Sequence, residues 1–211
     1  MNAVIITPVY SHAHEELDLA IKTSGIPSRR LYGHSDLPRA RSLLIEIALQ
    51  TGAERVIFVD ADTIPAPDHL RALAQSPAVT PERAVWGLYP LREGDRWSVQ
   101  PEGSAEAAER AIARAVPFPI RQGGLGLAAV HRESLARLGD TLPYIGEGGF
   151  RWRPFCVPFY RPGIPASEGV RYYADDYSLC VRLRETGTAL WCHPEYLAGH
   201  AVPRVIRSLQ A

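Results

Sequence analysis

The first hundred residues alternate between short apolar runs and segments in which apolar residues recur at helical spacing. This alternation predicts an α/β fold, in which a mostly parallel sheet carries helices on both faces. In such sheets, ligands bind beyond the carboxyl ends of the strands. The runs that predict strands are residues 3–7, 28–34, 55–60 and 84–91, and the helical segments are residues 11–25, 37–53 and 66–76.

One predicted strand runs straight into two carboxylates. The apolar residues Val56 to Val59 are followed by Asp60-Ala61-Asp62. In an extended chain, side chains two residues apart point the same way, so both carboxylates are expected to face one site. Two oxygen ligands there suit Mg²⁺ or Mn²⁺. The alternative is a polar turn in which Asp60 or Asp62 caps the next helix.

A phosphate ligand beside these acids would require a cation between them. Two unit charges about 4 Å apart repel by about 4 kcal/mol at an effective dielectric constant near 20. The acid pair with a metal ion therefore favours a diphosphate, whereas the pair without a metal ion disfavours it.

Composition excludes several classes of protein. The 211 residues carry 23 Lys+Arg and 23 Asp+Glu, and this zero formal charge argues against a nucleic-acid partner. No apolar run approaches the eighteen or so residues that span a bilayer, and the start reads as a strand rather than a signal peptide. The three cysteines, Cys156, Cys180 and Cys192, match no zinc or redox spacing, and we expect a cytoplasmic protein.

The second half of the chain is less regular. Residues 105–116 and 175–187 have helical patterns, residues 189–194 predict a short final strand, and Gly25 is expected just past the end of the first helix. Residues 151–172 are rich in proline and aromatics without a strand or helix period. A long loop of this kind is often a lid or a binding loop. Asp175 and Asp176 open the last helix, where negative charge stabilises a helix N-terminus by about 0.3–1 kcal/mol even without a catalytic role.

Several segments in the same order resemble the GT-A-fold glycosyltransferases, which use nucleotide-diphosphate sugars. The strand and acid pair in VIFVDADTIPAPDHL resemble the Asp-X-Asp motif of that family. AVIITPVY, DLPRARSLL, WGLYPLR, GGLGLAAVHRESLARLG and YADDYSLCVRLRETG resemble its other motifs. The resemblance covers most of the chain and implies one GT-A-type domain, a three-layer sandwich over residues 1–211. Its nucleotide-binding half would be residues 1–100, and its acceptor-binding half residues 101–211.

The resemblance also implies a metal site and a catalytic acid pair. Asp62 would coordinate Mn²⁺ or Mg²⁺ with the late histidine His200, while Asp60 would bind the ribose or join the outer coordination shell of the metal. In inverting members, the later acidic motif supplies the base that deprotonates the acceptor. The usual Glu-Asp is Asp175-Asp176 here, which aligns Asp176 with the base and leaves the choice between the two open.

On the nucleotide side, the resemblance implies a pocket for the base, the ribose and the diphosphate. The residues assigned to the nucleotide sugar are Pro8, Tyr10, Asp36, Arg41, Asp60 and Ala61. His12 and His14 are expected on different faces of the first helix, which Ser11 would cap, and are rejected as a metal pair.

The expected function is metal-dependent sugar transfer from a nucleotide-diphosphate sugar to an unknown acceptor, a saccharide or a small molecule, with inversion. The alternatives are a sugar-phosphate nucleotidyltransferase and a nucleotide-sugar binding module without catalysis. Trp152, Phe159 and Tyr160 are candidate acceptor contacts. Arg204 and Arg207 in the tail suggest contact with a membrane surface or a partner.

Overall fold

The structure is a computed structural model and describes residues 2–91, 96–147, 150–162 and 169–201. In this part of the chain, nine strands form one sheet in the order β2-β1-β3-β8-β5-β13-β7-β6, with β4 paired to β13. The strands of the sheet are β1 (Ala3–Val9), β2 (Ser28–Tyr32), β3 (Arg55–Val59), β4 (Thr63–Pro65), β5 (Arg83–Leu88), β6 (Val99–Pro101), β7 (Phe118–Gly123), β8 (Leu127–His131) and β13 (Ala189–His200).

The strand directions confirm the expected α/β class with a mostly parallel sheet. β1 pairs in parallel with β2 and β3, and β5 pairs in parallel with β13. β8 lies antiparallel between β3 and β5, so these two strands keep the same direction across it. Only β4, β7 and β8 of the described sheet strands run the opposite way.

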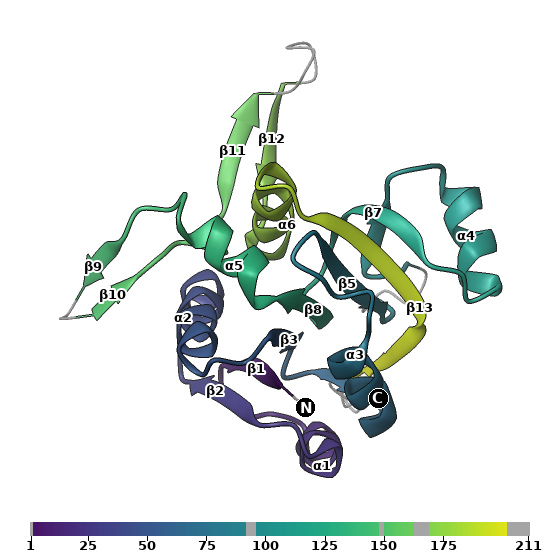
Figure 1. The fold of residues 1–211 in the computed structure, drawn as a ribbon, viewed down its shortest axis with the longest axis horizontal. Coiled ribbons are helices and arrows are strands. Elements are labelled where there is room, and N and C mark those ends of the chain that lie inside the picture. Colours follow the sequence, from purple (N-terminus) through teal and green to yellow (C-terminus); the bar gives the residue numbers. More distant parts are fainter. Residues whose placement is uncertain (1, 92–95, 148–149, 163–168, 202–211) are drawn as a thin grey trace, which may run out of the picture.

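Helices cover both faces of the sheet and make a three-layer sandwich (Figure 1). One layer holds α2, α5 and α6, and the opposite layer holds α1 and α3, while α4 lies outside these layers, near β7. The helices are α1 (Glu15–Ser24), α2 (Leu37–Gln50), α3 (Pro67–Gln75), α4 (Ala105–Ala113), α5 (Arg132–Gly139) and α6 (Asp175–Glu185).

The central strands contribute side chains to a separate core on each face. In β3, Val56 and Phe58 pack into the core that contains α2 and α6. Ile57 and Val59 pack into the core that contains α1 and α3. This alternation follows from the two-residue period of a strand. It directs the side chain of the next residue, Asp60, to the same face as Val56 and Phe58.

Two hairpins project from this body (Figure 1). They consist of β9 (Ile145–Glu147) with β10 (Phe150–Trp152), and of β11 (Phe159–Pro162) with β12 (Val170–Tyr173). The expectation of an irregular segment at residues 151–172 is therefore wrong. The segment between the hairpins is also anchored, because Glu46 on α2 accepts bonds from the Arg153 side chain at 2.7 and 2.9 Å.

Two element boundaries differ from expectation. Helix α1 begins at Glu15 after His14, and Ser11 bonds to His12 instead of capping the helix. His14 N donates to Ala61 O at 3.3 Å, and this tertiary contact draws residues 11–14 out of the helix. The final strand is also longer than the expected short one, since β13 continues through Ala198 to Gly199 and His200 by pairing with β4. Gly25 ends α1 in the left-handed conformation, as expected.

Candidate functional site

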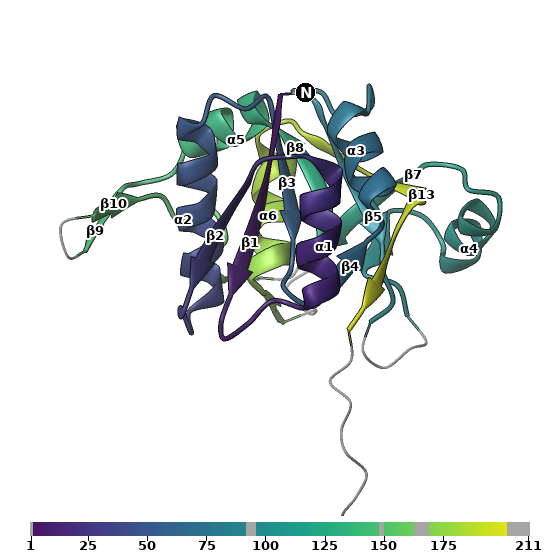
Figure 2. The same cartoon turned by 90° about the horizontal axis from the view of Figure 1, so that it is seen from below.

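A cavity of about 640 Å³ lies at the edge of the sheet where β1, β3 and β13 end. Figure 2 shows the arrowheads of β1, β2 and β13 pointing to this edge. Its walls come from the segments after β1 and β2, the Asp-X-Asp segment, and the ends of β5 and β13. The residues that line it include Pro8, Tyr10, His12, His14, His34, Asp60, Ala61, Asp62, Thr63, Tyr89, Leu91 and His200.

The Asp-X-Asp segment is a turn, and its two carboxylates point to different partners. Thr63 N donates to Asp60 O at 3.1 Å, which closes the turn after β3. Asp60 continues the alternation of β3 toward α2, whereas Asp62 faces His200. The expectation of an extended chain is therefore wrong, although both acids still line the same cavity. Neither of them caps α3, whose N-cap is Ala66.

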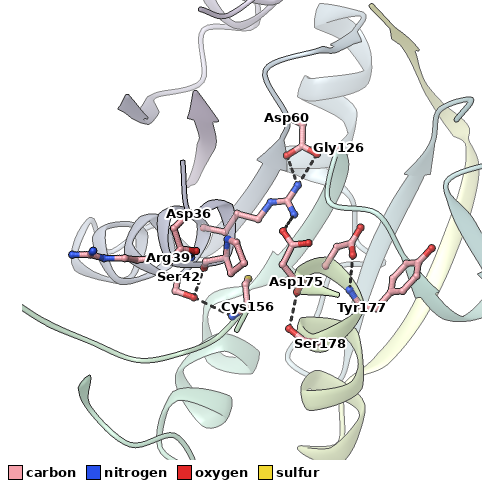
Figure 3. A network of polar contacts seen from close by, with 12 residues as sticks. Asp36, Arg39, Ser42, Asp60, Gly126, Cys156, Asp175, Tyr177 and Ser178 are labelled. Atoms are coloured by element: carbon pink, nitrogen blue, oxygen red, sulfur yellow. Dashed lines mark hydrogen bonds and ion pairs between the residues drawn. The ribbon is translucent and has the colours of Figure 1, made fainter. Parts of the chain in front are cut away.

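Arg41 on α2 joins Asp60 to Asp175 of the later acidic motif. Figure 3 labels these two acids and marks their contacts with dashed lines. Its Nη2 donates to both carboxylate oxygens of Asp60 at 2.7 Å, and its Nη1 donates to Asp175. The Arg41 side chain is only 5% exposed. Burial alone would lower the pKa of Arg41, but the charges of Asp60 and Asp175 outweigh burial and raise it. Arg41 is therefore a buried cation shared by two segments that lie far apart in the sequence.

The position of Arg41 follows from the pattern of α2. Arg41 precedes Leu44, Ile45 and Ala48 by three, four and seven residues, so it shares their face of the helix. That face packs into the core, which buries the guanidinium along with the apolar side chains. The side chain of Asp36 starts this helix by accepting a bond from Arg39 N at 3.1 Å.

Asp62 and His200 form the second polar contact of the site. His200 Nε2 lies 3.2 Å from Asp62 Oδ2, and His200 Nδ1 lies 3.0 Å from Pro90 O. A carbonyl oxygen only accepts, so Nδ1 carries a proton. In neutral His200, Nε2 would then direct a lone pair toward the carboxylate. The contact therefore needs a proton or a cation between the two groups.

The Asp62–His200 pair fits two neighbouring positions around a divalent cation. Bonds of 2.0–2.1 Å in an octahedron place adjacent ligand atoms about 3 Å apart, close to the observed 3.2 Å. The bond from Nδ1 to a backbone carbonyl is the support that metal-binding histidines usually have. Within the described ranges, no group of three or more His, Cys, Asp or Glu side chains is placed to hold a metal. Further ligands would have to come from a substrate and water.

Asp176 lies apart from the Arg41 bonds, at the first turn of α6. Its Oδ1 accepts from Tyr177 N at 2.8 Å. Burial raises its pKa from the ordinary 3.8 to about 6; Arg41 opposes this shift, and the neighbouring charge of Asp175 adds to it. Asp175 and Asp176 are thus distinct, because Asp175 is bonded to Arg41, whereas burial raises the pKa of Asp176 to about 6.

The glycine-rich turn before β8 brings the cavity close to Asp176. A Cβ on Gly124 would lie 2.1 Å from Tyr89 Oη and 3.5 Å from Asp176 Oδ2. Tyr89 Oη accepts a bond from Gly126 N at 3.1 Å. The rings of Tyr89 and His200 form a T-shaped pair with their centroids 5.8 Å apart. The close approach of Tyr89 requires glycine at this turn, and Tyr89 connects the turn to the Asp62–His200 pair.

The structure gathers some of the predicted site residues in the cavity and leaves others outside it. Those in the cavity wall are Pro8, Tyr10, Asp60, Ala61, Asp62 and His200. Arg41 and Asp175 lie behind Asp60, and Asp36 caps α2 while its neighbours Ser35 and Leu37 line the cavity. His12 and His14 precede α1 and both line the cavity, so their assignment to opposite faces of a helix is wrong.

The comparisons with known proteins rest on structure alone. No protein-family model matches the sequence, and no match is found among curated proteins. Protein A197 from STIV superposes with a TM-score of 0.62 at 14% identity, over 96% of this chain and 87% of that chain. GalNAc-T7, solved with UDP, GalNAc and Mn²⁺, superposes with a TM-score of 0.55 at 14% identity, over 95% of this chain and 44% of its own. The fold is GT-A-like.

Two features of this GT-A-like fold were not predicted from the sequence. Tyr89 was not singled out, because the predicted strand at residues 84–91 included it, whereas β5 ends at Leu88. The bonds of Arg41 to both acidic motifs were also missed, although Arg41 occupies a core position of α2.

In the described residues, no helix is long and apolar enough to cross a membrane. Arg204 and Arg207, the tail residues considered for surface contact, lie outside the described ranges.

Proposed function

We propose that this chain transfers a sugar from a nucleotide-diphosphate sugar to an acceptor hydroxyl, with inversion of the anomeric centre. The observation that carries the proposal is the arrangement at one edge of a GT-A-like sheet. There, an open cavity bears the Asp62–His200 pair, and Asp176, with its raised pKa, lies close behind the glycine turn. A fold neighbour, GalNAc-T7, was solved with UDP, a sugar and Mn²⁺, which supports the substrate class.

The donor would occupy the cavity, with the base and ribose beside the segment after β1. Pro8 and Tyr10 line that part, and Tyr10 is 70% exposed and available for stacking. Asp62 and His200 would hold Mn²⁺ or Mg²⁺, which when bound stabilises the negative charge of the departing diphosphate. Arg41 would act as a positioning residue, because it bonds to both Asp60 and Asp175 and holds their carboxylates in place.

Asp176 would take the proton from the acceptor hydroxyl. A general base works best when its pKa lies near the working pH, and burial moves the pKa of Asp176 to about 6. Asp175 is less suited to this role, since its carboxylate is bonded to Arg41. In this scheme, the deprotonated acceptor oxygen attacks the anomeric carbon, the bond to the diphosphate breaks, and a single displacement inverts the centre.

The alternatives predict different behaviour. A sugar-phosphate nucleotidyltransferase needs donors for a triphosphate after the first strand, where residues 7–17 contain no Gly, Lys or Arg. A binding module would bind the nucleotide sugar without turnover.

Hydrolysis or transfer of radiolabelled nucleotide sugars with Mn²⁺ distinguishes these functions. We expect Asp176→Asn to lower turnover by roughly 10²-fold or more while nucleotide binding is retained. Asp68→Asn, a change at an exposed acid on α3, serves as the control and should leave turnover unchanged. Undiminished turnover in Asp176→Asn would contradict the mechanism, and binding without turnover in the wild type would favour the binding module.

A further inference from the structure

The hairpin of β11 and β12 has one face fixed to the body of the protein. Phe159 pairs across the strands with Tyr173, and their rings lie 5.2 Å apart. The guanidinium of Arg182 on α6 lies 4.7 Å from the centre of the Phe159 ring. Arg161 on the same face forms a two-bond ion pair with Glu185 of α6. These contacts orient the hairpin, which reaches beyond α6 (Figure 1).

The other face of the hairpin is apolar and uncovered. Tyr160 pairs with Tyr172, and their ring centroids are 5.0 Å apart at an interplanar angle of 42°. Pro162 pairs with Val170 on the same face. Tyr160 is 71% exposed, Val170 67% and Tyr172 55%. An isolated two-stranded hairpin is at best marginally stable, and contiguous exposed apolar surface commonly marks a binding site.

We propose that this face, made of Tyr160, Tyr172, Pro162 and Val170, binds an oligosaccharide that serves as the acceptor of the transfer reaction. The inference rests on the proposed function and names the acceptor class for it. The faces of aromatic rings carry negative charge density, and the axial C–H groups of a pyranose are weakly positive. Two adjacent tyrosines therefore offer a stacking surface to a sugar, with hydroxyl groups at its rim.

The size and charge of the face favour a saccharide over a macromolecular surface. The described face consists of four side chains, whereas each partner in a standard protein interface contributes about 20–30 residues. A membrane-binding element usually surrounds its apolar face with cations. Here the arginine at the centre of β11, Arg161, points to the opposite face and is paired with Glu185.

The position of the face along the chain connects it to the proposed base. β12 leads through the N-cap Ala174 directly into Asp175 and Asp176. Tyr172 and Asp176 are four residues apart, so their Cα atoms are separated by at most about 14 Å. An oligosaccharide with its reacting end at Asp176 can therefore extend onto the tyrosine face.

Titration with oligosaccharides in the absence of any donor tests the proposal. The probes are hexasaccharides of glucose, N-acetylglucosamine and mannose, in α- and β-linked forms, followed by calorimetry or by NMR line broadening. We expect the wild type to bind at least one of them, and the double variant Tyr160→Ala/Tyr172→Ala to bind it at least about tenfold more weakly. Tyr160→Phe keeps the ring and should keep binding. Tyr32→Ala, at a tyrosine on β2 that is 57% exposed, is the matched control.

The other possible results of the titration would overturn the inference. The inference is overturned if no probe binds at millimolar concentration, or if the double variant binds as well as the wild type while keeping its thermal unfolding temperature. A dimer, or binding to phosphatidylglycerol vesicles, that the double variant abolishes would also overturn it, because the face would then belong to a second copy or to lipid. Metal-dependent nucleotide binding, measured separately, shows whether the proposed function fails independently.

Discussion

The site contains two acid pairs, Asp60 with Asp62 and Asp175 with Asp176. One acid of each pair bonds to the same arginine, and the pairs differ in what surrounds the other acid. Arg41 bonds to Asp60 and to Asp175, one member of each pair. Asp62, the remaining acid on the cavity side, faces the imidazole of His200 in an open cavity. Asp176, the remaining acid on α6, is mostly buried, and its pKa is raised to about 6. One acid therefore faces a histidine in an open cavity, as the proposed metal ligand requires, and the other has a raised pKa, as the proposed base requires.

Removing the shared arginine is expected to have the largest effect on this arrangement. Arg41→Met leaves the carboxylates of Asp60 and Asp175 without their cation, and breaking a buried ion pair in this way costs about 3–5 kcal/mol. Urea unfolding at pH 7 measures the loss. Arg41→Lys should fall between Arg41→Met and the wild type, because one ammonium group cannot reproduce the guanidinium fork. A loss below about 1 kcal/mol for Arg41→Met would show that the two pairs are not held through Arg41.

Filling the space between the cavity and Asp176 is expected to have the next largest effect. In Gly124→Ala, the new methyl group would meet Tyr89 Oη at 2.1 Å, and overpacking of this kind costs about 1–3 kcal/mol. Gly146→Ala in β9 is the matched control, since a Cβ there has nothing within 4 Å. Thermal unfolding of both variants measures the difference. Equal stability would mean that Tyr89 can move away without cost and does not fix the distance between the two acid pairs.

Neutralising Asp176 is expected to have a smaller effect with a defined pH dependence. The pKa of Asp176 is raised, so the folded protein keeps a proton that the unfolded chain releases above about pH 4. Its stabilising contribution is full below about pH 4 and is lost as the pH rises through about 6. Asp176→Asn should therefore be more stable than the wild type at pH 8, by about 1–2 kcal/mol, and this difference should shrink toward pH 4.

Urea unfolding at pH 5 and at pH 8 checks this prediction. Asp175→Asn is the comparison within the same pair and should lower stability at pH 8, because it removes a partner of Arg41. If Asp176→Asn also destabilises the protein at pH 8, the two acids are equivalent and the contrast between them fails.

The fold and part of the site could be predicted from local patterns. The alternation of apolar runs and helical segments predicts the α/β class, because burial on both faces and helical periodicity leave local signatures. Asp60 and Asp62 follow the end of β3, as the sequence predicted. Their separate directions were missed, because the turn from Asp60 to Thr63 contains neither glycine nor proline to mark it.

Contacts between distant segments could not be read from the residues alone. Asp62 and His200 are 138 residues apart, and only the family resemblance paired them. His12 and His14 reach the cavity because a bond between His14 N and Ala61 O overrides the local tendency toward helix. The strands at residues 151–172 escaped notice because β11 (FYRP) and β12 (VRYY) each place two aromatic residues next to each other beside an arginine, which gives no apolar alternation.

The most direct test of the account is whether Asp62 confers metal-dependent binding of a nucleotide diphosphate. Calorimetric titration of the wild type with UDP, GDP, CDP, ADP and TDP, with and without Mn²⁺, identifies the preferred base. The account predicts that at least one of them binds more tightly with Mn²⁺, and that Asp62→Ala removes the metal-dependent gain. Equal binding by Asp62→Ala, or no binding of any nucleotide by the wild type, would contradict it.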